Sequence, residues 1–486
     1  MRCSNRLNKK IVIFGASNSG KKLLSFLKSF NFDIRYFVDN DKNKWGKIFC
    51  DKEIKGPKIL RKINKEDYII IIGSMFIKEI SEQLESLGYN IDEDYITMHS
   101  FIKKSIDDNF NNILDSIKEK SLGKHKTNSI FITLPSGFIL GGVEIWSILA
   151  FKGLNEKYNN SYLINLNPKN EKKDYNYIKN YENKILNYNI KENNYMDSII
   201  DLCNQLTNYL PITIIPNHSE EMFIIGYILK NKYPTLVNIV SVLHSDLNYA
   251  YDMNKCYSDS ICKFVCVSEE IDNKFKEILP CRQIDINNKV SPVILENIRK
   301  SYSSEKEPIK IGFAGRLIKE QKRCDLLMEL IKKLKNLEIS FEINIAGEGE
   351  YYDIISEYVS KQNLASKINL YGIIPHNRMN NFWASQDIYL NVSDYEGTSL
   401  AMLEALGNGA VPIVTGVSGV EKVIDNNING FIVETGSVNK ILEYIKYLYY
   451  NRYKLQEFGQ KSINKINNIC CLNNYVTYLH DICELQ

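Results

Sequence analysis

Short apolar runs recur along the chain and alternate with longer stretches in which apolar residues return every third or fourth position. Runs of about four to eight residues rich in Ile and Val are typical of buried strands, and the longer stretches are typical of amphipathic helices. Because strands and helices alternate, the pattern predicts an α/β protein with parallel sheets. The predicted strands are residues 10–14, 33–38, 68–73, 129–134, 211–216, 236–244, 263–268, 309–314, 341–346, 368–372, 388–392, 411–415 and 430–433.

The predicted helices include residues 21–30, 145–154 and 324–335, and one that begins near Ala401. With 486 residues the chain is long enough for about three domains. Residues 155–208 are rich in Asn, Lys and Tyr and show no clear periodicity. The predicted organisation is a small Rossmann-like module at 1–104, a polar, partly helical linker at 105–128, α/β lobes at 129–300 and 301–472, and a helix at 473–486.

Composition excludes several classes of protein. Hydrophobic residues make up 44% and charged residues 24%, and the net charge is +3, so we expect a globular protein that does not bind nucleic acid. No run of 18 apolar residues occurs and the first residues lack a signal-peptide pattern, so we expect a cytoplasmic protein. The eleven cysteines show no CxxC spacing, which argues against zinc and disulfides.

The first strand is followed by a turn, Gly15 to Gly20, that nearly matches two nucleotide-binding motifs. Lys22 stands where a P-loop needs Ser or Thr to bind magnesium, and Ser17 stands where the dinucleotide fingerprint needs its middle glycine. Asp39 follows at a plausible spacing for a ribose contact. Two interpretations stay open: a nucleotide or nucleotide-sugar site, and a purely structural turn. The module resembles the Rossmann-like units that precede sugar acyltransferases and some glycosyltransferases, and this resemblance carries over no catalytic residue.

The most informative stretch runs from Ser393 to Leu406, where a predicted strand turns into a predicted helix. Such a turn offers free backbone N–H groups and the positive end of a helix dipole, so the amides from Gly397 to Leu400 can bind phosphate oxygens. Glu404 lies in an otherwise apolar helix, where a carboxylate is costly without a partner. Glu396 and Glu404 are therefore interpreted either as ordinary solvated acids or as ligands of the sugar and the ribose of a nucleotide-sugar.

Other polar residues follow the carboxyl ends of predicted strands, where ligands bind in open α/β sheets. Arg316 and Lys322 follow strand 309–314 and could neutralise a diphosphate, although isolated basic residues are usually surface charges. His244 ends strand 236–244, and it is either a ligand or a satisfied structural residue. Gly141 and Gly142 stand where a helix begins, and they allow either close approach to a ligand or an ordinary βα turn.

Together these motifs resemble the retaining GT-B glycosyltransferases of family 4, the glycosyl transferases of group 1. The resemblance covers about residues 129–486, and its strongest part is the pair Glu396 and Glu404 separated by seven residues. It implies two Rossmann-like lobes of a GT-B fold that face a cleft, preceded by the small Rossmann-like module. The supporting motifs are residues 141–144, 313–317 with Lys322, and 345–349.

The resemblance also implies a role for individual residues. Arg316 and Lys322 would stabilise the charge on the departing diphosphate, Glu396 would position sugar hydroxyls, and His244 would lie beside the reacting sugar. Lys322 lies one residue further from its arginine than in many members of the family. Glu404 would accept the ribose hydroxyls. The remaining donor-binding residues would be Gly141, Gly142, Gly315, Ile373, Gly397, Thr398, Ser399 and Leu400.

The implied reaction transfers a sugar with retention from a UDP- or GDP-sugar to a glycan or lipid-linked acceptor in cell-surface polysaccharide synthesis, without a cofactor. Acidic triplets at 39–41 and 92–94 match the DxD of metal-dependent enzymes, but they lie away from the other motifs, so we expect no metal site. Lys152 and Lys157 could rest on an anionic membrane surface. The alternatives are a nucleotide-sugar epimerase and a non-catalytic scaffold, and the sequence does not indicate an oligomeric state.

Overall fold

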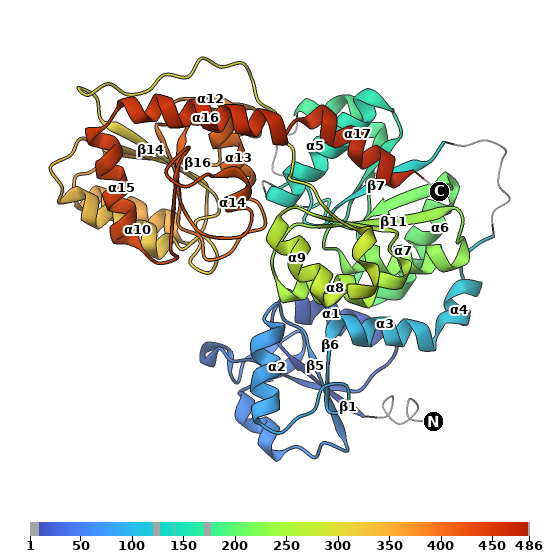
Figure 1. Cartoon of the computed structure of the whole chain (residues 1–486). Coiled ribbons are helices and arrows are strands. Elements are labelled where there is room, and N and C mark those ends of the chain that lie inside the picture. The colour runs from blue at the N-terminus through green and yellow to red at the C-terminus, as the bar shows by residue number, and fades with distance from the viewer. Residues whose placement is uncertain (1–8, 120–126, 140, 170–175, 485–486) are drawn as a thin grey trace.

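The computed structural model describes residues 9–119, 127–139, 141–169 and 176–484. They form three α/β units, each built on its own sheet (Figure 1). Nearly all strand pairs are parallel, and β3 with β4 is antiparallel. Side chains alternate across the first strand: Ile11 and Ile13 pack into one core and Val12 and Phe14 into another, as the period of two along a strand requires.

The N-terminal module has a six-stranded sheet in the order β3-β4-β2-β1-β5-β6, with α1, α2 and α3 packed around it. The order places β1 between β2 and β5, so the turn after β1 lies where a Rossmann sheet changes direction. Its elements are β1 (Lys10–Phe14), α1 (Asn18–Ser29), β2 (Ile34–Val38), β3 (Ile48–Phe49), β4 (Lys52–Lys55), β5 (Tyr68–Ile72), α2 (Ile77–Ser86), β6 (Tyr95–Thr97) and α3 (Met98–Asp108).

The N-terminal lobe has a seven-stranded sheet in the order β13-β12-β11-β10-β7-β8-β9. Residues 155–208, which sequence periodicity left unassigned, supply β8, β9 and α6. The elements are β7 (Ser129–Leu134), α5 (Gly142–Lys157), β8 (Ser161–Asn165), β9 (Ile185–Asn187), α6 (Tyr195–Leu206), β10 (Ile212–Ile215), α7 (Glu220–Lys232), β11 (Val237–Leu243), α8 (Asn248–Cys256), β12 (Lys263–Cys266), α9 (Glu269–Ile278) and β13 (Ile286–Asn288).

The C-terminal lobe has a six-stranded sheet in the order β16-β15-β14-β17-β18-β19, so its direction changes between β14 and β17. Its elements are β14 (Ile309–Ala314), α10 (Cys324–Lys335), β15 (Phe341–Ala346), α11 (Tyr351–Lys361), β16 (Ile368–Gly372), α12 (His376–Ala384), β17 (Ile388–Asn391), α13 (Leu400–Gly407), β18 (Val411–Thr415), α14 (Val420–Val423), β19 (Phe431–Val433), α15 (Val438–Tyr450) and α16 (Tyr453–Ile469).

The last helix, α17 (Leu472–Cys483), leaves the C-terminal lobe and packs on the N-terminal one (Figure 1). The Trp146 indole donates a hydrogen bond of 3.0 Å to the Tyr475 hydroxyl. The Cys483 carbonyl accepts one of 2.6 Å from the Thr213 hydroxyl. The chain therefore crosses between the lobes twice, once near residue 300 and again after α16.

The structure shows the surroundings of the two lysines expected at a membrane surface and of the expected linker. Lys152 of α5 pairs with Glu156, and Lys157 donates to the Thr477 hydroxyl of α17, so both lysines have partners within the protein. Part of the expected linker is α4 (Phe110–Asp115), which packs against α7. In the described part of the chain, every helix is too short or too polar to cross a membrane.

Candidate active site

The Ser393–Leu406 motif lies between β17 and α13, at the direction change of the C-terminal sheet. Hydrogen bonds hold the loop in place: the Asn391 side chain accepts from the Ser393 amide at 2.9 Å, and the Ser393 carbonyl accepts from the Thr415 hydroxyl at 2.6 Å. Among the described residues, no acceptor is found for the backbone N–H groups of residues 397–400. The turn therefore presents a group of backbone donors at a helix N-terminus, as phosphate binding requires.

Glu396 and Lys322 form a buried ion pair, with Nζ 2.5 Å from the carboxylate. Glu396 is 8% exposed and Lys322 9%, so both charges are largely removed from water. The Ser393 hydroxyl donates to the same carboxylate at 2.9 Å. Removing two charges from water is costly, so this pair must be held by good geometry and further hydrogen bonds. An ammonium has three donors, so Lys322 can also bind an anionic oxygen while it is paired.

Arg316 extends this group toward solvent. Its guanidinium donates to Gln321 at 2.7 Å, and Gln321 donates in turn to Glu396 at 3.4 Å. Arg316 is exposed, and its charge acts on Glu144 in the first turn of α5, on the opposite lobe. The structure therefore brings Arg316, Lys322 and Glu396 together, as predicted from strand ends. It adds Gln321, which no motif included, and Glu144, which ends the 141–144 motif but was given no role.

Glu144 explains the neighbouring glycine. Burial raises the pKa of Glu144 above its ordinary value, although hydrogen bonds from its own backbone and Ser136 and the charge of Arg316 act to lower it. A Cβ on Gly141 would lie 2.3 Å from the Glu144 carboxylate, so a larger residue there would require this side chain to move. A Cβ on Gly142 would meet no atom within 4 Å. The two glycines, predicted to act alike, therefore have different surroundings.

Glu404 is buried, and His376, the first residue of α12, lies 2.8 Å from its carboxylate. Burial acts to lower the pKa of His376, but the hydrogen bond and charge of Glu404 outweigh it and raise the pKa above the ordinary value. His376 therefore gives this carboxylate a partner within the protein, which the sequence pattern did not identify. Ile373 lies in the loop just before His376, at the end of β16.

His244 lies at the end of β11 on the facing lobe, held by the turn before α7. Its backbone N–H donates to His218 at 3.1 Å, and its Nε2 lies 3.1 Å from the Asn217 side-chain oxygen. The Asn217 nitrogen already donates to Thr133 and Ser147, so Nε2 of His244 carries the proton. Burial, with the charge of His218, lowers the pKa of His244 well below its ordinary value, so the imidazole is neutral at pH 7.

The motif loop touches the N-terminal lobe directly. A Cβ on Gly397 would lie 2.0 Å from the His244 carbonyl oxygen, so the two backbones meet at a distance that only glycine allows. The Thr398 hydroxyl donates to the Val267 carbonyl at 2.8 Å, and the Ser268 and Ser418 hydroxyls are 2.7 Å apart. The turn at residues 397–400 and His244 therefore lie at one junction between the lobes.

The corresponding turn of the N-terminal module is occupied by protein groups. Asp39 accepts hydrogen bonds from the Ala16 and Asp41 amides at 2.9 Å and an ion pair from Lys44 at 3.0 Å. A Cβ on Gly20 would lie 2.0 Å from the Gly15 carbonyl, so the glycines serve the tight turn itself. These contacts favour the structural interpretation of the turn over the nucleotide-binding one.

The N-terminal lobe covers this edge of the module. Lys22 pairs with Glu221 at 2.8 Å, and buried His99 pairs with Glu220, so the first two residues of α7 are both held by the module. Tyr249 of α8 packs edge-on against His99, with ring centroids 4.5 Å apart. In the described residues no group of three His, Cys, Asp or Glu side chains is arranged to hold a metal ion.

Two segments of the chain match models of known families. Residues 295–465 match the glycosyl transferases group 1 family, and residues 7–97 match the family described as C2185-like, N-terminal. An uncharacterized glycosyltransferase, MJ1178 of Methanocaldococcus jannaschii, is 27% identical over 314 residues, which are 58% of this chain and 84% of that protein. A poly(ribitol-phosphate) alpha-N-acetylglucosaminyltransferase of Staphylococcus aureus is 27% identical over 177 residues, 36% of this chain and 34% of the relative.

Solved structures share the fold at low identity. Anabaena Alr3699/HepE in complex with UDP has a TM-score of 0.59 at 12% identity and covers 73% of this chain and 100% of its own. TarM has a TM-score of 0.51 at 16% identity and covers 98% of both chains. The predicted fold class is confirmed: two Rossmann-like lobes have the GT-B arrangement, and the second contains most of the segment that matches the glycosyl transferases group 1 family.

Proposed function

We propose that this chain is a metal-independent, retaining glycosyltransferase that moves a sugar from a nucleoside diphosphate donor to a glycan or lipid-linked acceptor. One observation carries the proposal: the Lys322–Glu396 pair, the backbone donors of residues 397–400 and buried Glu404 lie on one edge of the C-terminal lobe, which meets the backbone of His244 at Gly397. The group 1 match of the same lobe supports it.

The donor diphosphate lies between the helix N-terminus and the two cations. The amides of residues 397–400 bind its oxygens, and Arg316 and Lys322 supply positive charge from the adjacent strand end. Glu404 accepts the ribose hydroxyls, and His376 orients that carboxylate from 2.8 Å away. Two side-chain cations and a helix terminus can neutralise a diphosphate, so the site needs no metal for this purpose.

The reaction proceeds on one face of the sugar. The acceptor hydroxyl oxygen bonds to the anomeric carbon as the bond from that carbon to the diphosphate oxygen breaks, and the electron pair of the broken bond stays on that oxygen. The leaving oxygen takes the acceptor proton. Arg316 and Lys322 stabilise the growing negative charge, and neutral His244 offers a hydrogen-bonding group beside the sugar without repelling the cations. Glu396, oriented by Lys322, positions sugar hydroxyls.

Relatives suggest the class of substrate. One acts on poly(ribitol-phosphate) with N-acetylglucosamine, and solved neighbours bind UDP or UDP-glucose. We therefore expect a UDP-linked hexose or N-acetylhexosamine as donor, with a GDP-sugar as second choice, and a cell-surface polymer or its lipid-linked precursor as acceptor. Such a reaction places the protein in the cytoplasm, at or near the inner face of the membrane.

The test is a panel of UDP-, GDP- and ADP-sugars incubated with the purified chain and short acceptor glycans, with products followed by mass spectrometry. The proposal predicts that one donor yields an acceptor heavier by one sugar together with free nucleoside diphosphate, and that NMR of the product shows the anomeric configuration of the donor. An epimerised nucleotide-sugar without transfer would instead identify an epimerase. Failure to bind any member of the panel in thermal shift would identify a scaffold.

A further inference from the structure

One edge of the N-terminal module is unusually basic. Residues 42–65 contain nine Lys or Arg side chains and two acidic ones, whereas the whole chain has a net charge of only +3. The segment includes η1 (Lys42–Lys44), the β3–β4 hairpin and η2 (Pro57–Lys62), and the hairpin forms the outer edge of the sheet. It lies at the opposite end of the sheet from β6.

Few of these cations serve the fold. Lys44, Lys55 and Lys65 pair with Asp39, Glu53 and Asp94. The others have no ion pair with any carboxylate in the described part of the chain; they are Lys42, Lys47, Lys52, Lys58, Arg61 and Lys62. Like charges held close together repel one another, so this edge favours an anionic ligand.

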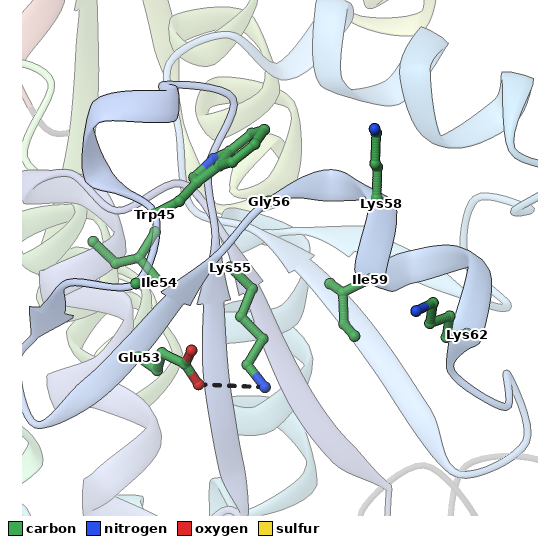
Figure 2. A pocket seen from close by; sticks show the side chains of 9 residues that line it. Trp45, Glu53, Ile54, Lys55, Gly56, Lys58, Ile59 and Lys62 are labelled. Atoms are coloured by element: carbon green, nitrogen blue, oxygen red, sulfur yellow. Dashed lines mark ion pairs between the residues drawn. The ribbon is translucent and has the colours of Figure 1, made fainter.

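A recess of 280 Å³ lies within this edge, between Trp45, β4 and η2 (Figure 2). Trp45, Ile54 and Ile59 line it together with Lys55, Lys58 and Lys62, and Lys55 is paired with Glu53 at 3.4 Å. We call this the Trp45 recess. Its size is at the lower end of small-molecule pockets, roughly 300–1,000 Å³, and suits a single sugar-sized unit.

The Trp45 ring is held rigidly in place. Its indole N–H donates to the Asp39 carbonyl at 2.7 Å. A Cβ on Gly56 would lie 2.9 Å from the ring, so the ring lies flat on the backbone at that glycine. Trp45 is nevertheless 37% exposed, which leaves part of the ring open to a ligand. A fixed, partly exposed aromatic face binds with little loss of side-chain freedom.

We propose that the Trp45 recess binds a phosphate- or carboxylate-bearing unit of the acceptor glycan, outside the catalytic cleft. The C–H face of a sugar or polyol packs on the indole, and the anionic group is held by Lys58 and Lys62. The inference rests on the proposed function, because it assigns an anionic polymer as the acceptor. A glycan fits better than a membrane surface, since the aromatic ring lines a recess and does not project from the protein.

The position of the module suits an anchoring role. In Figure 1 the module lies beside the N-terminal lobe and away from the C-terminal lobe, where the predicted donor site lies. Its opposite edge is fixed to the N-terminal lobe through the Lys22–Glu221 and His99–Glu220 pairs. A polymer bound in the Trp45 recess is therefore held at a constant distance from the cleft, which raises the local concentration of acceptor ends there.

The experiment measures binding of an oligogalacturonate, a glycerol phosphate oligomer and a neutral dextran oligosaccharide to the full chain. We expect the two anionic probes to bind in a salt-sensitive manner and the neutral one to bind weakly. The double variant Lys58→Glu/Lys62→Glu should weaken anionic binding about tenfold. The matched variant Lys78→Glu/Lys104→Glu changes charge equally on other helices of the same module, and it should retain wild-type binding.

A second variant tests the aromatic wall without changing any charge. Gly56→Ala displaces the Trp45 ring, so it should weaken binding of the oligogalacturonate more than binding of inorganic phosphate. Equal losses in the two double variants, or wild-type binding after Lys58→Glu/Lys62→Glu, would overturn the proposal. So would a variant that loses affinity for phosphatidylglycerol vesicles while keeping its affinity for both anionic oligosaccharides.

Failure of the glycan-binding proposal can be distinguished from failure of the proposed function. Lys58 and Lys62 lie outside the predicted donor site, so their double variant should bind nucleotide-sugars and transfer to a short neutral acceptor at the wild-type rate. If the chain transfers sugar but neither anionic probe binds, this inference fails alone. If both probes bind in the recess but no donor binds or reacts, the proposed function fails and the chain is an anionic-glycan-binding protein.

Discussion

Two strand-end edges of this protein look alike in sequence and differ in structure. In the N-terminal module and in the C-terminal lobe, a parallel strand leads into a glycine turn with a basic residue nearby, Lys22 in one and Lys322 in the other. The module's edge is packed against α7 and α8, and its basic residue pairs across that contact with Glu221. The lobe's edge meets the facing lobe at Gly397 but keeps exposed Arg316 and a row of backbone donors.

The difference shows that a glycine turn indicates tight packing before it indicates a ligand. At Gly20 and at Gly347 a Cβ would strike the carbonyl of a neighbouring turn glycine, Gly15 in the module and Gly315 in the lobe, at 2.0 and 1.9 Å. The two edges differ in whether the polar groups beyond the turn already have partners within the protein. In the module the Asp39 carboxylate is already bound by Ala16 and Lys44. In the lobe, the backbone N–H groups of residues 397–400 have no acceptor among the described residues.

The largest loss of activity should come from removing Arg316 or Lys322 at the edge of the C-terminal lobe. Arg316→Ala should lower kcat/KM about 10²–10³-fold, because a charge that stabilises the leaving diphosphate is lost. Arg316 is exposed, so the variant should unfold at the wild-type temperature. Lys322→Ala should be at least as damaging, but it also leaves Glu396 buried without its partner, so its stability must be measured in parallel. Wild-type activity in both variants would contradict the assignment of the donor site.

The next largest effect should come from a substitution at the junction between the lobes. Gly397→Ala places a methyl group against the His244 carbonyl, so the lobes must separate slightly. A displacement of about 1 Å can cost roughly 10²-fold in rate, and we expect kcat to fall more than donor affinity. Gly142→Ala is the control, because its Cβ meets no atom within 4 Å. Steady-state kinetics with the identified donor checks both, and equal effects would mean that the Gly397 contact is not part of the active arrangement.

A substitution at the edge of the N-terminal module should lower the stability of the protein and leave donor binding unchanged. Lys22→Met leaves buried Glu221 without its ion partner and should lower the free energy of unfolding by about 1–3 kcal/mol, less than for a fully buried pair because Lys22 is half exposed. The control is Lys78→Met, an exposed lysine of the same module. Urea denaturation measures the loss, and donor KM should stay at the wild-type value. A raised donor KM without loss of stability would indicate a nucleotide site in the module.

The smallest effect should be a pH dependence at His376. Its pKa is raised in the folded protein, so the stabilisation from its protonated form is complete below the unfolded pKa of about 6.5 and is lost as pH rises through the folded value. The difference in unfolding free energy between wild type and His376→Gln should therefore be larger near pH 6 than near pH 9. A difference that grows with pH would contradict the pairing with Glu404.

Local patterns predicted the strands and part of the helices. Strands 10–14, 129–134, 309–314 and 341–346 and helix 324–335 have the bounds inferred from apolar runs, because buried parallel strands are nearly continuous in Ile and Val. Residues 155–208 escaped assignment because their strands, β8 and β9, are short and lie toward the sheet edge, among many polar residues.

Contacts between segments far apart in the sequence could not be predicted from local patterns. The pairing of Glu404 with His376 and of His99 with Glu220 joins residues that no shared motif connects. The return of α17 to the N-terminal lobe was equally hidden, since its apolar face does not say which lobe it covers. The roles predicted for Arg316, Lys322, Glu396 and Glu404 stay predictions, and the structure adds that all four lie on one lobe edge.

Titration of UDP and then GDP into the purified chain by calorimetry tests the central claim most directly, with Glu404→Ala and Asp39→Asn as paired variants. These acids are the ones predicted from sequence to contact a ribose on the two edges, and in the structure Glu404 contacts His376 whereas Asp39 is bound by Ala16 and Lys44. The account predicts one nucleotide site per chain, weakened about tenfold or more by Glu404→Ala and unchanged in the Asp39→Asn variant, provided that it stays folded. Binding that survives Glu404→Ala and is lost in folded Asp39→Asn would contradict it.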